Sequence, residues 1–178
     1  PPRRHGVKVT TVRHLATAWT RDGRLQGRRD EPLLRPAVGD PAVAARLVAL
    51  RGDPAWCSTL RRTRETADVY GRSDAKASPL LDEIDFGVFE GRTRGELLAD
   101  TDGRWITDPF ATPLGLALKD LEARVLRVVA AVRAGRGPGL IFGHGVWLRL
   151  FATIAAGRPR GELNRFNIPP GGVLELEL

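Results

Sequence analysis

Several residue types that mark large protein classes are scarce in this sequence. It has one cysteine, Cys57, in 178 residues, which excludes an internal disulfide framework and a multi-thiolate zinc site. Aromatic residues make up only 6% of the chain, too few for a platform on which nucleic-acid bases stack. The apolar runs around residues 140–142 and 146–156 are too short or too interrupted to cross a bilayer, so we expect no membrane partner.

The N-terminal end lacks a methionine and shows no secretory signal, which would place a charged segment before an apolar one. We therefore expect residues 1–6 to be a disordered or cloning-derived lead and the protein to be cytoplasmic. His5 lies in this lead and is assigned no role. The remaining residues, 7–178, have the length of a single domain.

Lysine is also scarce, although the formal net charge is +7. Of the 28 Lys and Arg residues only Lys8, Lys76 and Lys119 are lysines, and the arginines are spread along the chain. This distribution does not favour a nucleic-acid partner, and a basic nucleic-acid binder is the weakest of the alternatives. A small anionic substrate fits the charge equally well.

The pattern of apolar residues alternates between strand and helix signals. Strands are expected at residues 7–12, 55–57, 140–142 and 173–178, and helices at about 41–51, 60–70, 95–100, 121–132 and 146–156. Asp40 followed by Pro41 is a typical helix start, with a side-chain acceptor before a residue of preset φ. This order predicts a three-layer α/β/α sandwich around a mostly parallel sheet.

Two of the three histidines follow predicted strands. His14 comes after residues 7–12, and His144 comes after residues 140–142. Ligands of open α/β sheets bind at the carboxyl ends of the strands. Gly143 and Gly145 flank His144 and permit close approach of the backbone to a ligand, and the following helix points its N-terminal N–H groups at the same place. The two histidines are therefore candidates for an anion site.

Cys57 is followed by an arginine-rich segment that does not fit a thiol phosphatase. That chemistry needs His-Cys-x5-Arg, but Trp56 precedes Cys57 and Thr63 stands where the arginine is required. We expect Cys57 to be a small core residue, and two of the three arginines at positions 61, 62 and 64 to lie on a solvated helix face.

Five segments, in order, resemble the histidine phosphatase superfamily, which has the phosphoglycerate-mutase-like fold. Arg13-His14-Leu15-Ala16-Thr17 resembles that family's opening Arg-His-Gly-Glu-Thr, and Gly23-Arg24-Leu25-Gln26-Gly27 resembles its Gly-Arg-x-Gln-Gly turn. Residues 58–67, 81–91 and 143–149, and Asn167 with the closing strand, resemble its later segments. Gln26-Gly27 resembles the phosphatase branch.

The resemblance implies hydrolysis of a phosphomonoester through a phosphohistidine, without metal or cofactor. It implies that His14 is the nucleophile and that Arg13, Arg62 and His144 hold the phosphoryl oxygens. Glu83 matches the family's proton donor, with Asp82 and Asp85 as fallbacks, and Glu90 is expected to brace an arginine or a turn. Further substrate contacts are expected from residues of the turn and the two strand ends, namely Thr20, Gln26, Gly27 and Gly145.

Three departures from the family pattern bear on the pocket. Leu15 and Ala16 replace Gly and Glu directly after His14, Thr20 replaces an Asn, and the Gly-Glu-Ser expected before the long helix is absent. Leu15 is expected to narrow or reorient the pocket floor. A small insertion at about residues 92–116, with Trp105 and Phe110, is expected to cap the site and select the non-phosphate half of the substrate.

The sequence therefore predicts a metal-independent phosphatase that acts on a small anionic phosphorylated metabolite. A phosphoglycerate-type mutase and a catalytically weak phosphoester-binding relative are the alternatives. The oligomeric state is not indicated by the sequence, and a homodimer is left open.

Overall fold

The computed structural model of the chain describes residues 6–178. Residues 1–5 of the predicted lead, including His5, lie outside the described residues, and only Gly6 of the lead is described. A five-stranded sheet forms the centre of the molecule, in the order β3-β2-β4-β1-β5. Its strands are β1 (Lys8–Arg13), β2 (Ala55–Cys57), β3 (Lys76–Ala77), β4 (Leu140–Gly143) and β5 (Val173–Glu177). Every neighbouring pair is parallel except β1 and β5, which confirms the mostly parallel sheet.

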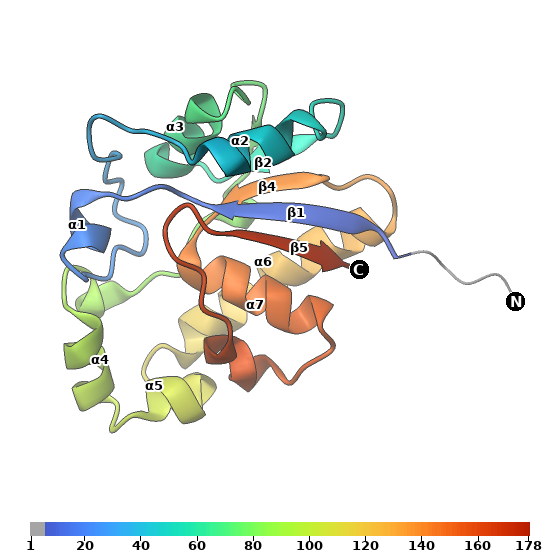
Figure 1. Cartoon of the computed structure of the whole chain (residues 1–178). Coiled ribbons are helices and arrows are strands. Elements are labelled where there is room, and N and C mark those ends of the chain that lie inside the picture. Colours follow the sequence, from blue (N-terminus) through green and yellow to red (C-terminus); the bar gives the residue numbers. More distant parts are fainter. Residues whose placement is uncertain (1–5) are drawn as a thin grey trace, which may run out of the picture.

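Helices cover both faces of the sheet and complete the predicted three-layer sandwich (Figure 1). In Figure 1, α2 (Pro41–Val48) and α3 (Arg61–Val69) lie on one side, and α6 (Gly115–Arg133) and α7 (Gly145–Ala155) lie on the other. The shorter helices are α1 (Ala18–Arg21), α4 (Arg94–Asp100) and α5 (Arg104–Thr107), with 3₁₀ turns at Pro79–Leu81, Gly87–Phe89, Pro109–Ala111 and Arg160–Arg165.

The long helix α6 shows why the sequence folds into these layers. Leu118, Leu121, Val125 and Val132 recur at helical spacing and are at most 1% exposed. They pack with Phe151 of α7 and other buried side chains into the larger apolar core under the sheet. Burial of such side chains stabilises the fold by roughly 1.5–3 kcal/mol each, so this stripe fixes α6 against α7.

Two parts of the cap region differ from the expectation. α6 begins at Gly115, six residues before the predicted start, and the short helix α5 was not predicted. Gly115 lies before the predicted start of the helix, and a Cβ there would lie 2.2 Å from the carbonyl oxygen of Phe110. The glycine therefore permits a close approach at the start of the helix. α5 has only four residues, too short for its periodicity to be recognised.

The predicted helix starts are otherwise close to those observed. Asp40 accepts a hydrogen bond from the amide of Ala42, 2.7 Å away, and Pro41 is the first residue of α2, as predicted.

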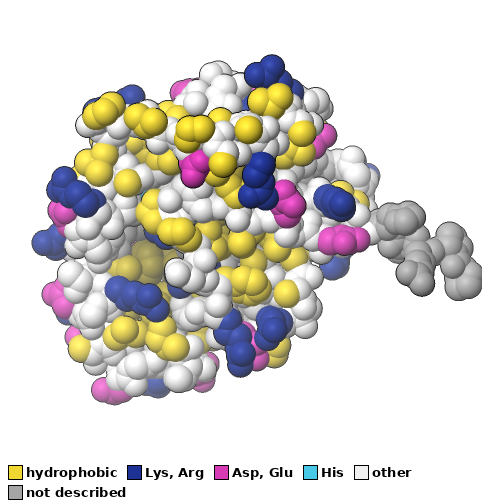
Figure 2. Space-filling view, in the orientation of Figure 1, with side chains coloured by type: hydrophobic (Ala, Val, Ile, Leu, Met, Phe, Trp, Pro, Cys, Tyr) yellow, Lys and Arg dark blue, Asp and Glu magenta, His cyan; other side chains and the backbone are white. Residues whose placement is uncertain are grey.

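On the face shown in Figure 2, Lys and Arg side chains are scattered and interspersed with Asp and Glu. Among residues 6–178, no helix combines the length and the apolar character that a bilayer crossing requires.

Candidate active site

The two strand-end histidines lie side by side because their strands are neighbours. β1 and β4 pair in parallel, with Arg13 opposite Gly143, so the next residue of each strand is a histidine. The amide of His14 donates to the carbonyl of Gly143 over 2.9 Å, and the ring centroids of His14 and His144 are 5.3 Å apart. The sheet thus brings together residues that are far apart in the sequence, as the strand-end argument predicted.

His14 has its ring nitrogens in the state that a nucleophile requires. Its Nδ1 lies 2.8 Å from the carbonyl oxygen of Leu15, which can only accept, so Nδ1 carries the proton. Burial, together with the charges of Arg62 and Arg13, holds the pKa of His14 well below its usual value. The ring is therefore neutral at pH 7, and Nε2 keeps its lone pair.

His144 has the opposite tautomer and lies behind the pocket wall. The Nε of Arg62 donates to its Nδ1 over 3.2 Å, so Nε2 carries the proton and donates to Oγ of Ser58 over 2.7 Å. His144 is fully buried and does not line the cavity in which His14 lies. Sequence reasoning did not assign a role to Ser58, although it opens the second family-like segment.

Arg62 connects His144 to the loop that precedes α2. Its Nη1 and Nη2 donate to the carbonyls of Arg29 and Gly27 over 2.7 and 2.8 Å. The side chain is 1% exposed, and burial lowers its pKa to about 10, so it stays charged at pH 7. Each Nη has a second N–H group with no acceptor among the described residues, and Arg62 lines the cavity beside His14.

Arg13 enters the same cavity from the end of β1. Its Nη1 donates to the carbonyl of Ile168 over 2.6 Å, while its buried Nε has no partner in the described part of the chain. A Cβ at position 145 would lie 3.3 Å from Cζ of Arg13, so Gly145 gives the guanidinium room beside the start of α7. An unpaired buried donor is costly, and an anion in the cavity would provide the missing acceptor.

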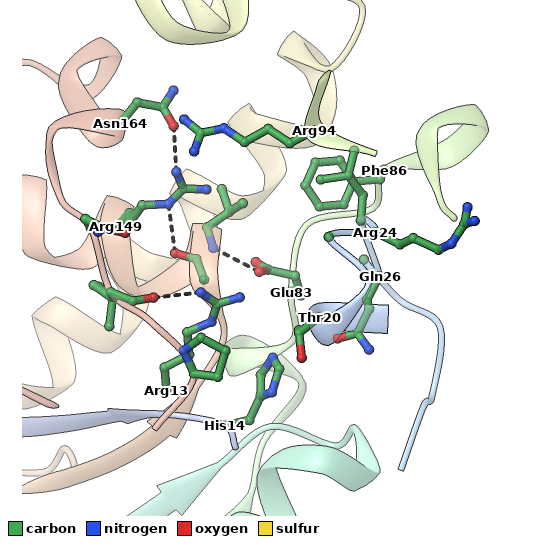
Figure 3. A pocket seen from close by; sticks show the side chains of 18 of the residues that line it. Arg13, His14, Thr20, Arg24, Gln26, Glu83, Phe86, Arg94, Arg149 and Asn164 are labelled. Carbon is green, nitrogen blue, oxygen red and sulfur yellow. Dashed lines mark hydrogen bonds between the residues drawn. The ribbon is translucent and has the colours of Figure 1, made fainter. Parts of the chain in front are cut away.

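Glu83 is the acidic residue of the site. Its Oε1 accepts from the amides of Ile84 and Trp147, and its Oε2 accepts from the amide of Val146. The fallback candidates lie elsewhere: Asp82 is held by Thr59, and Asp85 is exposed and caps a turn. Neither lines the cavity, whereas Glu83 does (Figure 3).

A cavity of about 430 Å³ opens beside His14. All of the predicted site residues except His144 line this cavity. They are Arg13, His14, Thr20, Gln26, Gly27, Arg62, Glu83 and Gly145. Gln26 is held by a hydrogen bond from its side-chain amide to Oγ1 of Thr17. The cap contributes Trp105 but not Phe110, which packs against Arg160.

The expectation that Leu15 narrows this pocket is wrong. The side chain of Leu15 lines a separate hollow with Val38, Tyr70 and Pro169, on the other side of the β1 end. Successive residues of an extended segment point to opposite sides, so the position after His14 faces away from the site. The side chain of Leu15 therefore does not take up space in the cavity beside His14.

Three smaller predictions are confirmed. Cys57 is buried, and burial raises the pKa of its thiol to about 11, as suits a core residue. Arg61 and Arg64 are exposed on α3, whereas Arg62 is buried. Glu90 braces the turn at Gly27, because its carboxylate accepts from the amide of Arg28 over 2.6 Å.

Sequence reasoning missed the far end of the cavity. Arg24, Arg94, Arg149 and Asn164 also line it. Arg149 could have been found, since it lies one helical turn after Gly145 and residues of a first turn face the strand ends. Arg94 and Asn164 come from the cap and from a 3₁₀ turn, and no local pattern places those segments over the site.

The buried histidines predict a pH-dependent stability. The folded-state pKa of His14 and of His144 lies well below the value near 6.5 of an unfolded chain, so below about pH 6.5 the unfolded state binds more protons. We expect the free energy of unfolding to fall by up to about 1.4 kcal/mol per pH unit for each histidine as the pH drops below about 6. Urea unfolding at pH 5 to 7.5 measures this slope. A His144→Gln variant with the wild-type slope would contradict it.

Comparisons with known proteins agree with this geometry. The model of the histidine phosphatase superfamily (branch 1) matches residues 9–178. An acid phosphatase of Mycobacterium tuberculosis is 26% identical over 171 residues, which cover 93% of this chain and 84% of the relative. A probable phosphoglycerate mutase of Enterobacter sp. (strain 638) is 30% identical over 168 residues, covering 86% of this chain and 76% of the relative.

The fold comparison gives the same result. The solved structure of the open reading frame Rv3214 of Mycobacterium tuberculosis superposes with a TM-score of 0.79 at 25% identity, covering 97% of this chain and 91% of that one. The paired strand-end histidines, the buried Arg62 and the family match over nearly the whole chain lead to one conclusion. This protein belongs to the histidine phosphatase superfamily.

Proposed function

We propose that the protein is a phosphatase that hydrolyses a small phosphomonoester through a phosphohistidine on His14, without a metal. The observation that supports this most directly is the state of His14: a neutral ring with a free Nε2, beside a cavity that contains Arg13 and Arg62. Positive donors around the phosphoryl oxygens and an in-line nucleophile are what phosphoryl transfer requires.

In the first step, Nε2 of His14 attacks phosphorus, and the bond to the alcohol oxygen breaks. Arg13 and Arg62 hold the phosphoryl oxygens through guanidinium N–H groups. Glu83, when protonated, gives its proton to the leaving oxygen. Its Oε2 accepts only one hydrogen bond from the described residues, so it has the capacity to carry that proton.

In the second step, the Glu83 carboxylate takes a proton from water, and the resulting nucleophile attacks the phosphohistidine. Inorganic phosphate leaves, and His14 recovers its lone pair. His144 does not line the cavity, so it acts through Arg62, whose Nε donates a hydrogen bond to its Nδ1. Thr20, Gln26, Gly27 and Gly145 would contact the substrate from the wall of the cavity.

The phosphatase proposal predicts a simple activity. The protein is expected to hydrolyse p-nitrophenyl phosphate in excess EDTA. It is also expected to be inhibited by vanadate, which mimics the phosphoryl group in the transition state of its transfer. Steady-state assays between pH 4 and 9 on a phosphomonoester panel measure this. No turnover on any member of the panel would contradict the proposal and favour a phosphoester-binding protein.

A mutase is the second candidate, because one 30% identical relative is a probable phosphoglycerate mutase. A mutase would move phosphate between two positions of a glycerate and depend on a bisphosphate primer. Net release of inorganic phosphate from the same substrate favours hydrolysis instead. The remaining alternative, a catalytically weak phosphoester-binding relative, is not favoured by the leucine at position 15, because that side chain lies outside the cavity.

A further inference from the structure

The cavity contains more positive charge than one phosphate can offset. Five arginines line it, at positions 13, 24, 62, 94 and 149, and Glu83 is the only acidic residue among its lining. Within residues 6–178, none of the five lies within 4.0 Å of a carboxylate oxygen. A phosphate dianion offsets two of these five charges, and Glu83 can offset at most one more, so at least two remain.

Arg149 is held rigidly at the end of the cavity away from His14. Its Nε donates to the carbonyl of Gly145 over 3.1 Å, and its Nη1 donates to Oδ1 of Asn164 over 2.7 Å. Asn164 is itself anchored, because its amide donates to the carbonyl of Trp105. Among the described residues Nη2 of Arg149 has no partner, and burial lowers the pKa of this side chain to about 10, so it remains charged at pH 7.

Arg94 approaches Arg149 from the cap. It is the first residue of α4, and Figure 3 shows its guanidinium extending toward Arg149 and Asn164. Arg94 has no hydrogen-bond acceptor for its side chain among the described residues, whereas Arg92, on the same segment, pairs with Asp100 over 2.6 Å. Arg24 differs, because it donates to the carbonyl of Gly91 and extends away from Arg149 in Figure 3.

Two guanidiniums that approach each other with no carboxylate within 4.0 Å repel, and a shared anion relieves that repulsion. We propose that Arg94 and Arg149 bind a second anionic group of the substrate, so that the preferred substrates are small phosphomonoesters that also carry a carboxylate or a second phosphate. This inference rests on the proposed function, since it assumes that the first phosphate lies beside His14. It assigns Arg94 and Arg149 to substrate selection.

The test compares matched ligands that differ in the second group. Calorimetry at 0.15 M salt measures the Kd of 3-phosphoglycerate, glycerol 3-phosphate and 1,3-propanediol bisphosphate on the His14→Ala chain, so that turnover does not interfere. Each is repeated with Arg94→Gln added, and with Arg127→Gln added as a control. Arg94 and Arg127 are both exposed, and Arg127 lies on α6 outside the cavity, so the two changes remove the same charge without disturbing the core.

We expect 3-phosphoglycerate or the bisphosphate to bind at least about tenfold more tightly than glycerol 3-phosphate. Arg94→Gln should bring that ratio close to one, and Arg127→Gln should leave it unchanged. Whichever of the two anionic probes binds more tightly identifies the second group. Equal Kd values for all three ligands, or the same ratio with and without Arg94, would overturn the inference. Hydrolysis of p-nitrophenyl phosphate by the unaltered chain, measured separately, tests the phosphatase proposal.

Discussion

Replacing His14 with alanine is expected to lower kcat/KM for p-nitrophenyl phosphate by about 10⁴-fold or more. Without the imidazole no covalent intermediate forms, and hydrolysis would require direct attack by water. The residual rate would come from the arginines that hold the phosphoryl group. Initial rates at pH 6 to 7, at several substrate concentrations, measure the change.

The same variant gives a second readout that separates chemistry from folding. Wild-type protein mixed with ³²P-labelled substrate and quenched rapidly should carry acid-labile, base-stable phosphate, and His14→Ala should carry none. Since His14 is 2% exposed, its replacement leaves a small cavity, so thermal unfolding must show that the variant is folded. A folded His14→Ala protein with undiminished turnover would refute the assignment of the nucleophile.

Replacing Arg62 with lysine is expected to lower kcat/KM by about 10³-fold, although the charge is kept. The guanidinium spans three acceptors at once: Nδ1 of His144 and the carbonyls of Arg29 and Gly27. The single ammonium group of a lysine cannot donate to all three of these acceptors and to the phosphate as well. At least one buried acceptor would lose its donor, which also costs about 1–3 kcal/mol of stability.

Arg64→Lys is the matched control, because Arg64 is exposed on the same helix and lies outside the cavity. It should change kcat/KM by less than about twofold and stability by less than about 0.5 kcal/mol. Steady-state kinetics and urea unfolding of both variants give the comparison. If Arg62→Lys keeps more than a third of the wild-type kcat/KM, the reaction does not depend on the forked shape of the Arg62 guanidinium.

The sequence was sufficient to predict the sheet and its layers. The strand at residues 140–143 is a continuous buried apolar run, the closing strand alternates apolar and acidic residues, and the long helix carries a buried stripe at 3.6-residue spacing. β3 has two residues, both exposed, and its assignment comes only from pairing with β2. Such an edge strand has no apolar pattern of its own to recognise.

The site was predictable where a residue is fixed by its strand or by a family-like segment. His14, Arg62 and Glu83 are of this kind, because short segments next to the sheet position them. The direction of Leu15 was not predictable without the path of the backbone after β1. The contribution of Asn164 depends on how the 3₁₀ turn at Arg160–Arg165 packs under the cap, a long-range contact that no local spacing encodes.

The parallel pairing of β1 with β4 has a consequence for how this architecture can diversify. The spacing of the two imidazoles is set by backbone hydrogen bonds of the sheet, before any ligand arrives. Other residues that line the cavity, such as Arg94 and Trp105, come from a peripheral segment that supplies none of those bonds. Exchange of that segment would change the far part of the cavity while the spacing of the two histidines stays the same, so evolution or engineering can alter ligand preference without altering the paired histidines.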